Sequence, residues 1–347
     1  MNYIEITAKA LGISKTTVYR SQKTTGNVSP RTRERINRYI SEHFPEKIAR
    51  FEFNAAHSNG KAKFLTFIMP NKPSFFWDDV ICGIKKAEEK YEKSNVIINY
   101  YFYSGDINEK EIYSILCRLE KLLPDGIAIV PTQSSEIAEM VRNISERIPV
   151  VFLNDYCNDC ENVARVITNG IEEGRKIGEI MCSQISDGTV LVLLSDGFES
   201  SIFQERLRGF KDYCSESGSN LEITEIAYES NGDRYVSNTI LPSLLARTIA
   251  KEMQSRKNVK AVYIPNGICY QLMLAVKKLR RDDIYVYSHE ADLKARRMFK
   301  NGMRGGYVTS DAFSQGYLAS RYLCQKVLGD KTDNLSLITW FEFDRFD

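Results

Sequence analysis

The side chains best suited to recognising another molecule lie within the first 20 residues. Lys15, Thr16 and Arg20 follow a glycine, Gly12, and fall on one short helical stretch. Lysine and arginine pair with the acceptor atoms of guanine, while threonine offers a hydroxyl or packs its methyl group on thymine. In a helix-turn-helix, the second helix enters the major groove of DNA. The pattern favours DNA contact, and the alternative is an ordinary helical hairpin with exposed charges.

The charge of the chain is unevenly distributed. Residues 1–63 hold 12 Lys and Arg against 5 Asp and Glu, a net charge of +7, whereas the remaining residues hold 35 against 40, a net charge of −5. We call residues 1–63 the head and the remaining residues the body. A basic head on a mildly acidic body indicates that the head alone contacts nucleic acid. A basic, solvated surface is the plainer alternative.

The head carries start and stop signals for three short helices. Residues 4–11 have apolar side chains at helical spacing, and a glycine ends that stretch. Ser14 is a good N-cap for a second helix over residues 15–23. Ser29, which is followed by a proline, fits the N-cap of a third helix over residues 31–43. We therefore predict a small all-α unit.

From residue 63 onward, short apolar runs alternate with helix-length amphipathic segments. Such runs are typical of parallel strands that are buried on both faces, and the alternation predicts doubly wound α/β sheets. We expect strands at 64–69, 96–103, 127–130, 150–153, 190–194, 221–227, 261–264 and 284–287, with helices such as 78–91 and 202–216 between them. About ten strand signals exceed what one such sheet usually holds, which predicts two lobes. Ligands of open α/β sheets bind beyond the carboxyl ends of the strands.

The head resembles the LacI/GalR family of transcription regulators in two motifs. The family pattern A-x-x-A-G-V-S-x-x-T-V-S-R is similar to A-K-A-L-G-I-S-K-T-T-V-Y-R at residues 8–20, and V-S-x-x-T-R-x-R-V to V-S-P-R-T-R-E-R-I at residues 28–36. Two motifs at the right separation are far more specific than one. The resemblance, which continues to about residue 330, implies a helix-turn-helix domain followed by a two-lobed periplasmic-binding-protein type I domain.

The resemblance assigns residues of the head to DNA. The family's base-contacting positions fall on Lys15, Thr16 and Arg20, and a phosphate contact falls on Thr17. Further candidate DNA contacts in the head and the hinge are Ser14, Tyr19, Arg33, Ala49 and Arg50. Tyr19 replaces a small serine, and this departure bears on the operator sequence rather than on the fold.

The hinge matches the family less well. The chain keeps a proline, Ala49 and Arg50, but Glu52 stands where the family has a leucine that wedges into the minor groove. A carboxylate cannot serve as an apolar wedge between bases. Three alternatives stay open: Phe51 or Phe53 acts as the wedge, the DNA is not kinked, or the segment is a plain flexible linker.

The resemblance also implies an effector site between the lobes. The residues that fall on the family's ligand positions are Phe75, Phe76, Asn169, Arg206, Asn266, Glu290 and Asp311. Aromatic rings pack on the apolar face of a sugar and fixed polar groups bond its hydroxyls, so we expect a sugar or a sugar derivative. Structural roles are the alternatives. Phe75 would then be core and Glu290 a helix N-terminal acid. Arg206 would pair with Glu205 or Glu216.

These observations predict the domain organisation. We expect a helix-turn-helix domain at 1–47, a hinge at 48–62 and an effector-binding and dimerisation domain at 63–347. The first lobe is expected to hold approximately 63–160 and 290–316, and the second 161–289 and 317–347. The β-rich run Leu335–Phe343 is predicted to be a final strand rather than a tetramerising helix. A homodimer would place two heads on a pseudo-palindromic, double-stranded DNA operator.

The sequence gives little support for a catalytic site or a metal site. Cys157 and Cys160 form a Cys-x-x-Cys pair, but no second pair with zinc spacing follows and the chain has 3 histidines. A thiol switch and a plain loop after a strand are the two interpretations of that pair. The sequence has no Walker loop, no nucleophile elbow and no zinc-protease motif. We therefore expect that the protein is not an enzyme and that it binds neither a cofactor nor a metal ion.

Two other classes of protein share parts of this pattern. One is a solute-binding or sensor protein of the same fold without operator-specific DNA binding, and the other is a helix-turn-helix protein whose body only dimerises. A solute-binding protein should begin with a signal peptide or a lipid-attachment cysteine. The first residues have no basic n-region before an apolar stretch, and no apolar run is long enough to span a bilayer. We therefore expect a cytoplasmic protein without membrane contact.

Overall fold

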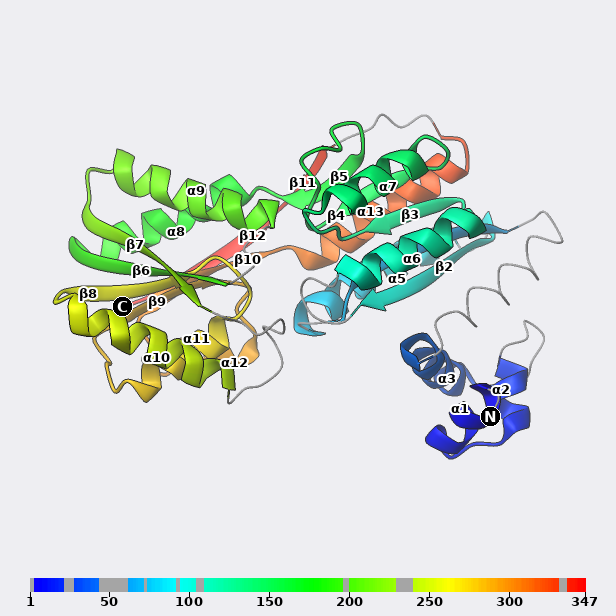
Figure 1. Cartoon of the computed structure of the whole chain (residues 1–347), viewed down its shortest axis with the longest axis horizontal. Coiled ribbons are helices and arrows are strands. Elements are labelled where there is room, and N and C mark those ends of the chain that lie inside the picture. Colours follow the sequence, from blue (N-terminus) through cyan, green and yellow to red (C-terminus); the bar gives the residue numbers. More distant parts are fainter. Residues whose placement is uncertain are drawn as a thin grey trace.

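The computed structural model describes residues 3–21, 28–43, 62–71, 74–91, 94–103, 109–195, 200–228, 240–330 and 336–347. Three short helices at the N-terminus precede two α/β lobes (Figure 1). Ala49, Arg50 and nearly all of the predicted hinge lie outside the described residues. None of the helices in the described part of the chain combines the length and the apolar character that a membrane span requires.

The N-terminal helices are α1 (Tyr3–Leu11), α2 (Lys15–Ser21) and α3 (Pro30–His43). The turn between α1 and α2 depends on Gly12, whose φ of +64° favours glycine. The hydroxyl of Ser14 then accepts a hydrogen bond from the backbone N–H of Thr17 at 3.0 Å and caps α2. Val18 and Ile36 are fully buried in the small core that the three helices share. The predicted start of α2 is therefore confirmed.

The first lobe is built on a fully parallel sheet with the strand order β11-β5-β4-β3-β1-β2. Its strands are β1 (Lys63–Pro70), β2 (Val96–Tyr103), β3 (Gly126–Ile129), β4 (Val150–Leu153), β5 (Ala164–Thr168) and β11 (Ser336–Thr339). Helices α5 (Ser74–Tyr91) and α13 (Ala312–Val327) cover one face, and α6 (Glu109–Leu122) and α7 (Ser135–Ser145) cover the other (Figure 1). All four residues of β3 and of β4 are buried, which explains their continuous apolar sequence.

The second lobe repeats this architecture with the strand order β7-β6-β8-β9-β10-β12. Its strands are β6 (Asp187–Ser195), β7 (Asn220–Tyr228), β8 (Val259–Ile264), β9 (Tyr285–His289), β10 (Gly305–Ser310) and β12 (Phe341–Phe346), and only β12 runs antiparallel to its neighbour. Helices α8 (Gly170–Gln184) and α9 (Ser201–Glu216) cover one face, while α10 (Ile240–Ser255), α11 (Cys269–Lys278) and α12 (Leu293–Lys300) cover the other (Figure 1). The predicted doubly wound α/β fold with two lobes is confirmed.

The chain passes between the lobes three times, always at the carboxyl ends of the parallel strands. It leaves the end of β5 for α8 and the end of β10 for α13. The third passage joins the end of β11 to β12, whose first residue, Phe341, pairs with Ser310 at the end of β10. The two carboxyl edges therefore face each other, which is where ligands of open α/β sheets bind.

The sheets divide the chain differently from the predicted lobe ranges. β5, β11 and most of α13 were expected in the second lobe and belong to the first, whereas α12 and β10 were expected in the first and belong to the second. The predicted final strand is in fact two strands, β11 and β12, which are separated by Trp340 and lie in different sheets. Apolar periodicity reports burial but not the sheet that a strand joins, so these boundaries required the structure.

Helices α8 and α9 contact each other through their backbones along a row of glycines. A Cβ on Gly174 would lie 1.9 Å from the carbonyl oxygen of Arg206, and one on Gly178 would lie 3.3 Å from that of Phe210. Gly170 makes the same kind of contact one turn earlier. The contacts recur every fourth residue on both helices, so the helices lie side by side and run in the same direction.

Replacing Gly174 by alanine should destabilise the protein, even though alanine is the better helix former. The new methyl group would overlap a backbone carbonyl, which cannot move without separating the helices. We expect a loss of about 1–3 kcal/mol in the free energy of unfolding, measured by urea denaturation. Glu179→Ala, on the exposed side of α8, should change it by less than about 0.5 kcal/mol. Equal midpoints for the two variants would contradict the close backbone contact.

Candidate functional site

The predicted base-contacting residues lie on the outer side of α2. Lys15, Thr16, Tyr19 and Arg20 are exposed, because Val18 and Ser21 supply the buried side of this helix. Lys15 also forms an ion pair with Glu5 of α1. The arrangement leaves a basic and hydroxyl-bearing helix face open to solvent.

Three further candidates for DNA contact have structural partners within the head. The side chain of Ser14 caps α2, and its oxygen lies 2.8 Å from the hydroxyl oxygen of Thr17. The guanidinium of Arg33, on α3, donates to the backbone carbonyl of Ser21 at the end of α2 and is half-buried. Arg33 thus ties α3 to α2, a role that the sequence motif does not reveal.

A buried polar cluster surrounds Arg206 at the carboxyl edge of the second sheet. Arg206 Nε donates to Glu173 at 2.7 Å, and Arg206 Nη2 donates to Glu290 at 2.8 Å. Nη1 donates to the carbonyl of Pro265 at 3.2 Å, and Nη2 also bonds the hydroxyl of Ser310 at 3.0 Å. Arg206, Glu173 and Glu290 are nearly or fully buried, so one guanidinium is shared between two buried carboxylates.

Several segments that are far apart in the sequence position this cluster. Arg206 lies on α9, and Glu173 is in the first turn of α8, just after the chain has crossed from the first lobe. Glu290 follows β9 with a φ of +54°, and Ser310 ends β10, just before the chain crosses back. The hydroxyl of Thr168, at the end of β5 in the first lobe, also donates to Glu173 at 2.5 Å. The cluster therefore connects the second lobe to two of the passages between the lobes.

The charges of the cluster fix its protonation. Burial by itself lowers the pKa of Arg206, but the adjacent charges of Glu173 and Glu290 raise it above its ordinary value, so the guanidinium stays charged. Burial raises the pKa of Glu290, and the positive charge of Arg206 opposes that shift. Burial and Arg206 together lower the pKa of His289 well below its usual value, which keeps this imidazole neutral. Its Nε2 lies 3.0 Å from the hydroxyl oxygen of Tyr263.

Several buried polar atoms near the two carboxyl edges have no hydrogen-bond partner among the described residues. They are Thr132 Oγ1 and Gln315 Nε2 in the first lobe, and Ser195 Oγ, Asn266 Oδ1 and His289 Nδ1 in the second. Each of these residues ends a strand, follows one closely or begins the helix after it. Buried polar groups are usually satisfied, so these atoms are places where a bound polar molecule or water would complete the bonding.

The structure places the predicted ligand residues unequally. Arg206 and Glu290 are in direct contact, and Asn266 is one residue beyond the carbonyl that Arg206 binds. Asn169 and Asp311 cap α8 and α13 at two of the passages between the lobes, accepting backbone hydrogen bonds at 3.2 and 2.8 Å. These five residues share the carboxyl edges of the sheets.

The two aromatic candidates belong to the first turn of α5. Phe76 is buried and packs edge-on against Trp77, with ring centres 5.0 Å apart, so its ring is part of the core of the first lobe. Phe75 is only half-buried and packs at the margin of the same core. Of the two rings, Phe75 is the one that retains exposed surface for a ligand.

Arg206 pairs with Glu173 and Glu290, and not with Glu205 or Glu216, which the sequence suggested as alternatives. Glu205 accepts a hydrogen bond from the hydroxyl of Tyr156 at 2.5 Å, and Glu216 pairs with Arg175 at 2.6 Å. The true partner Glu173 was missed by sequence reasoning. An acidic residue in the first turn of a helix complements the helix dipole in any protein, so its type and position carried no distinguishing signal.

A second missed feature joins the two lobes directly. Asp155, after β4, accepts a hydrogen bond from the backbone N–H of Tyr156 at 2.8 Å and faces the start of α9, whose polar groups help to lower its pKa. Gln133 Nε2 donates to the hydroxyl of Ser201 at 2.9 Å, and Tyr156 donates to Glu205 on the same helix. Burial raises the pKa of Asp155 to about 6, and the hydrogen bonds it accepts oppose that shift. The loop after β4 thus holds the N-terminus of α9 against the first lobe.

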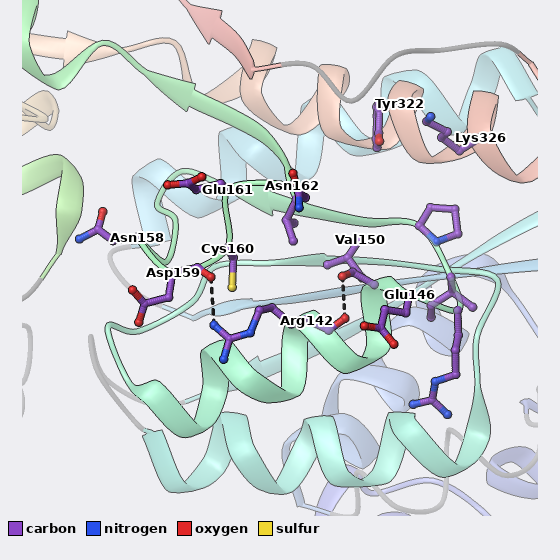
Figure 2. A pocket seen from close by; sticks show the side chains of 15 residues that line it. Arg142, Glu146, Val150, Asn158, Asp159, Cys160, Glu161, Asn162, Tyr322 and Lys326 are labelled. Carbon is purple, nitrogen blue, oxygen red and sulfur yellow. Dashed lines mark hydrogen bonds between the residues drawn. The ribbon is translucent and has the colours of Figure 1, made fainter.

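A cavity of about 950 Å³ lies elsewhere in the first lobe, between the end of α7, the loop 158–163 and the end of α13 (Figure 2). Its charged side chains have mixed sign and include Arg142 and Glu161. Arg142 Nη1 donates to the carbonyl of Asp159 at 2.9 Å. None of the predicted ligand residues lines it, so this cavity is distinct from the carboxyl-edge cluster. Within the described ranges, no group of three or more His, Cys, Asp or Glu is arranged to hold a metal ion.

Comparison with known proteins agrees with this architecture. Residues 65–331 match the family model of the periplasmic binding protein domain. The HTH-type transcriptional repressor PurR from Vibrio campbellii is 27% identical over 231 residues, which span 65% of this chain and 64% of the repressor. The alignment therefore covers less than two thirds of the length of that relative. PurR from Vibrio atlanticus is 23% identical over 77% of this chain and 80% of its own length.

Solved structures share the fold of the two lobes. A glucose-galactose binding protein, GanP, from Geobacillus stearothermophilus superposes with a TM-score of 0.68 and 18% identity, covering 82% of this chain and 97% of GanP. A protein assigned as a LacI transcriptional regulator from Bacteroides fragilis superposes with a TM-score of 0.69 and 16% identity, covering 82% and 96%. At these identities the likeness concerns the fold alone, and it is shared by binding proteins and regulators.

Replacing Arg206 by methionine should leave two carboxylates buried without their counter-charge. We expect the free energy of unfolding to fall by about 3–5 kcal/mol, because breaking a buried ion pair strands the remaining charge. Arg208→Met, an exposed position on the same helix, should change it by less than about 0.5 kcal/mol. Urea denaturation at pH 7 measures both. If the Arg206 variant is as stable as the Arg208 variant, the buried ion pairs of Arg206 do not stabilise the fold.

Proposed function

We propose that this chain, which belongs to the periplasmic binding protein domain family, is a sequence-specific DNA-binding transcriptional regulator, and specifically a repressor. A small, sugar-like effector would bind between its lobes and control its affinity for DNA. The observation that carries the proposal is the exposed row Lys15, Thr16 and Arg20 on a capped helix that follows a glycine turn. The similarity to repressors named PurR supports it.

The DNA side of the proposal follows from the exposed face of α2. Helices of this kind place their first residues against base edges in the major groove, and a side chain such as Arg20 reads guanine through two acceptors. Two heads of a homodimer would bind two half-sites of a palindromic operator, because the symmetry of the protein is matched by that of the DNA. The net charge of +7 on residues 1–63 favours attraction to phosphates.

The effector side follows from the chemistry of the carboxyl edges. Buried atoms that lack a hydrogen-bond partner within the described ranges, such as Asn266 Oδ1 and His289 Nδ1, suit a ligand that both donates and accepts hydrogen bonds. Arg206 already has two carboxylate partners, so it offers little attraction to an added anion. An uncharged, hydroxyl-rich molecule fits this balance best. Such a ligand would stabilise one arrangement of the lobes over another and thereby shift DNA affinity.

A solute-binding or sensor protein without operator-specific binding is the second candidate function. The observation that favours it is the fold shared with GanP and with a carbohydrate transporter solute-binding protein from Agrobacterium radiobacter, which superposes with a TM-score of 0.71 and was solved in complex with D-arabinose. That protein is 16% identical and covers 82% of this chain and 94% of its own length. Both candidates keep the effector site, and they differ only in what the head does.

Binding of the full chain to the DNA upstream of its own gene tests the proposal. We expect tight, sequence-selective binding that weakens steeply as salt increases, because contacts to phosphates release counterions. The double variant Lys15→Ala/Arg20→Ala should bind at least about 30-fold more weakly, since each base contact contributes about 1–3 kcal/mol. Fluorescence anisotropy at two salt concentrations measures both quantities.

The matched control removes the same two charges elsewhere. Arg247→Ala/Lys251→Ala lies on the exposed side of α10 and should bind DNA like the unaltered protein. If both double variants lose affinity equally, the effect is one of net charge. If neither loses affinity, the head does not read DNA through α2, and the solute-binding alternative gains.

A further inference from the structure

Helices α8 and α9 place two cysteines next to each other one turn beyond their row of close contacts. Gly174 and Gly178 face Arg206 and Phe210, and the next residues at the same four-residue spacing are Cys182 and Cys214. Their sulfur atoms lie 3.8 Å apart. The glycine contacts hold the two helix backbones together, so this proximity is fixed by the packing and does not depend on a flexible loop.

The two thiols differ in access to solvent. Cys214 is buried beneath the helix pair, with 4% of its surface exposed, whereas Cys182 is half-buried. Cys182 also lines a surface cavity of about 340 Å³ together with polar side chains, among them Ser217 and Ser219. A small reactant entering this cavity would meet the sulfur of Cys182 first.

The surroundings of Cys182 favour its thiolate. The hydroxyl oxygen of Ser217 lies 3.6 Å from the sulfur of Cys182 and 3.0 Å from the carbonyl oxygen of Cys214, and the sulfur of Cys214 is 3.8 Å away. Hydrogen bonds from Cys214 and from nearby serines lower the pKa of Cys182 to about 6, against the opposing effect of burial. The pKa of Cys214 is raised by the same contact and by burial. Cys182 is therefore suited to react first, with the thiol of Cys214 beside it.

We propose that Cys182 is a peroxide-reactive thiol and that Cys214 is its resolving partner, so that oxidation joins α8 to α9 by a disulfide. The thiolate of Cys182 attacks one oxygen of hydrogen peroxide, the O–O bond breaks, and a sulfenic acid and hydroxide form. The hydroxide takes up the proton that the Cys182 thiol released on ionising, which gives one water. The sulfur of Cys214 then attacks the sulfenic sulfur, the S–O bond breaks, and a second water leaves with the thiol proton. Two thiols are oxidised to one disulfide while the peroxide is reduced to two waters.

The geometry requires only a small movement. A disulfide has a sulfur–sulfur distance of about 2.0 Å, so the two sulfurs must approach by less than about 2 Å. The Cys157–Cys160 pair offers a contrast. Cys160 borders the larger cavity, and contact with Cys157 lowers its pKa, but both thiols are nearly fully buried and donate to the carbonyls of Thr132 and Ala138 at 3.2 and 3.4 Å. The sequence motif thus draws attention to one pair, while the structure favours a pair 32 residues apart.

Peptide mapping of the full chain after treatment with hydrogen peroxide tests the proposal. The chain has 8 cysteines, and we expect the number of free thiols, counted after denaturation, to fall by two. Mass spectrometry should find one linked pair of peptides, which contain Cys182 and Cys214. The variant Cys157→Ser/Cys160→Ser should form the same link at the same rate. In Cys214→Ser, the sulfenic acid should persist on Cys182 and be trapped by dimedone.

Two results would overturn the proposal. One is a folded protein whose Cys182 reacts with an alkylating reagent but forms no link to Cys214 under peroxide. The other is loss of two thiols that disappears in Cys157→Ser/Cys160→Ser, which would assign the reaction to the motif pair. The variant Cys182→Ser, which keeps the size of the side chain, should lose the link while retaining the unfolding midpoint of the reduced protein.

Discussion

The ion-paired cluster around Arg206 is the interaction on which the arrangement of the second lobe depends. Three charges are removed from water there, and the two carboxylates can stay buried only while the guanidinium of Arg206 contacts both of them. Glu173 and Ser310 stand at two of the passages between the lobes, so the cluster fixes where the chain enters and leaves the second lobe. The carboxyl edges of the sheets acquire their relative position from these passages.

The close packing of α8 and α9 makes that cluster possible. Glycines on α8 let the backbone of α9 approach, and this brings the guanidinium of Arg206 within 2.7 Å of Glu173. Asp155 and Gln133 then hold the N-terminus of α9 against the first lobe. A ligand that bonded to the unpartnered atoms nearby would compete with, or add to, these contacts. Such a ligand would therefore act on the contacts that join the two lobes.

The sequence predicted the local elements well, because burial leaves a direct trace in residue order. The run 150–153 was expected as a strand, and it forms β4 with those bounds. The short strands β5 and β10 were missed, because polar residues such as Arg165 and Thr309 interrupt their apolar character. The assignment of segments to lobes failed at 305–310 and 336–339. Sheet membership is decided by contacts between segments that are far apart in the sequence, and a local pattern does not contain them.

Sequence patterns identified some residues of the Arg206 cluster and missed others, because local patterns do not record which segments pack together. Family positions identified Arg206 and Glu290, which do meet, but not Glu173, which binds the same guanidinium. A first-turn acid resembles any other in sequence, and only the packing of α8 on α9 shows its role. Phe76 was expected at the ligand, yet its ring packs in the core beside Trp77. Aromatic type alone does not distinguish a stacking surface from a core side chain.

The most direct test of control by an effector is to measure how a bound ligand changes the affinity for DNA. A panel of uncharged monosaccharides and polyols would be screened for compounds that raise the unfolding temperature of the full chain, since a ligand stabilises the state it binds. DNA affinity would then be measured with and without a saturating amount of such a compound. The account predicts that the dissociation constant for DNA changes by about 5–150-fold, and that DNA changes the affinity for the compound by the same factor. A compound that binds while leaving DNA affinity unchanged would contradict it.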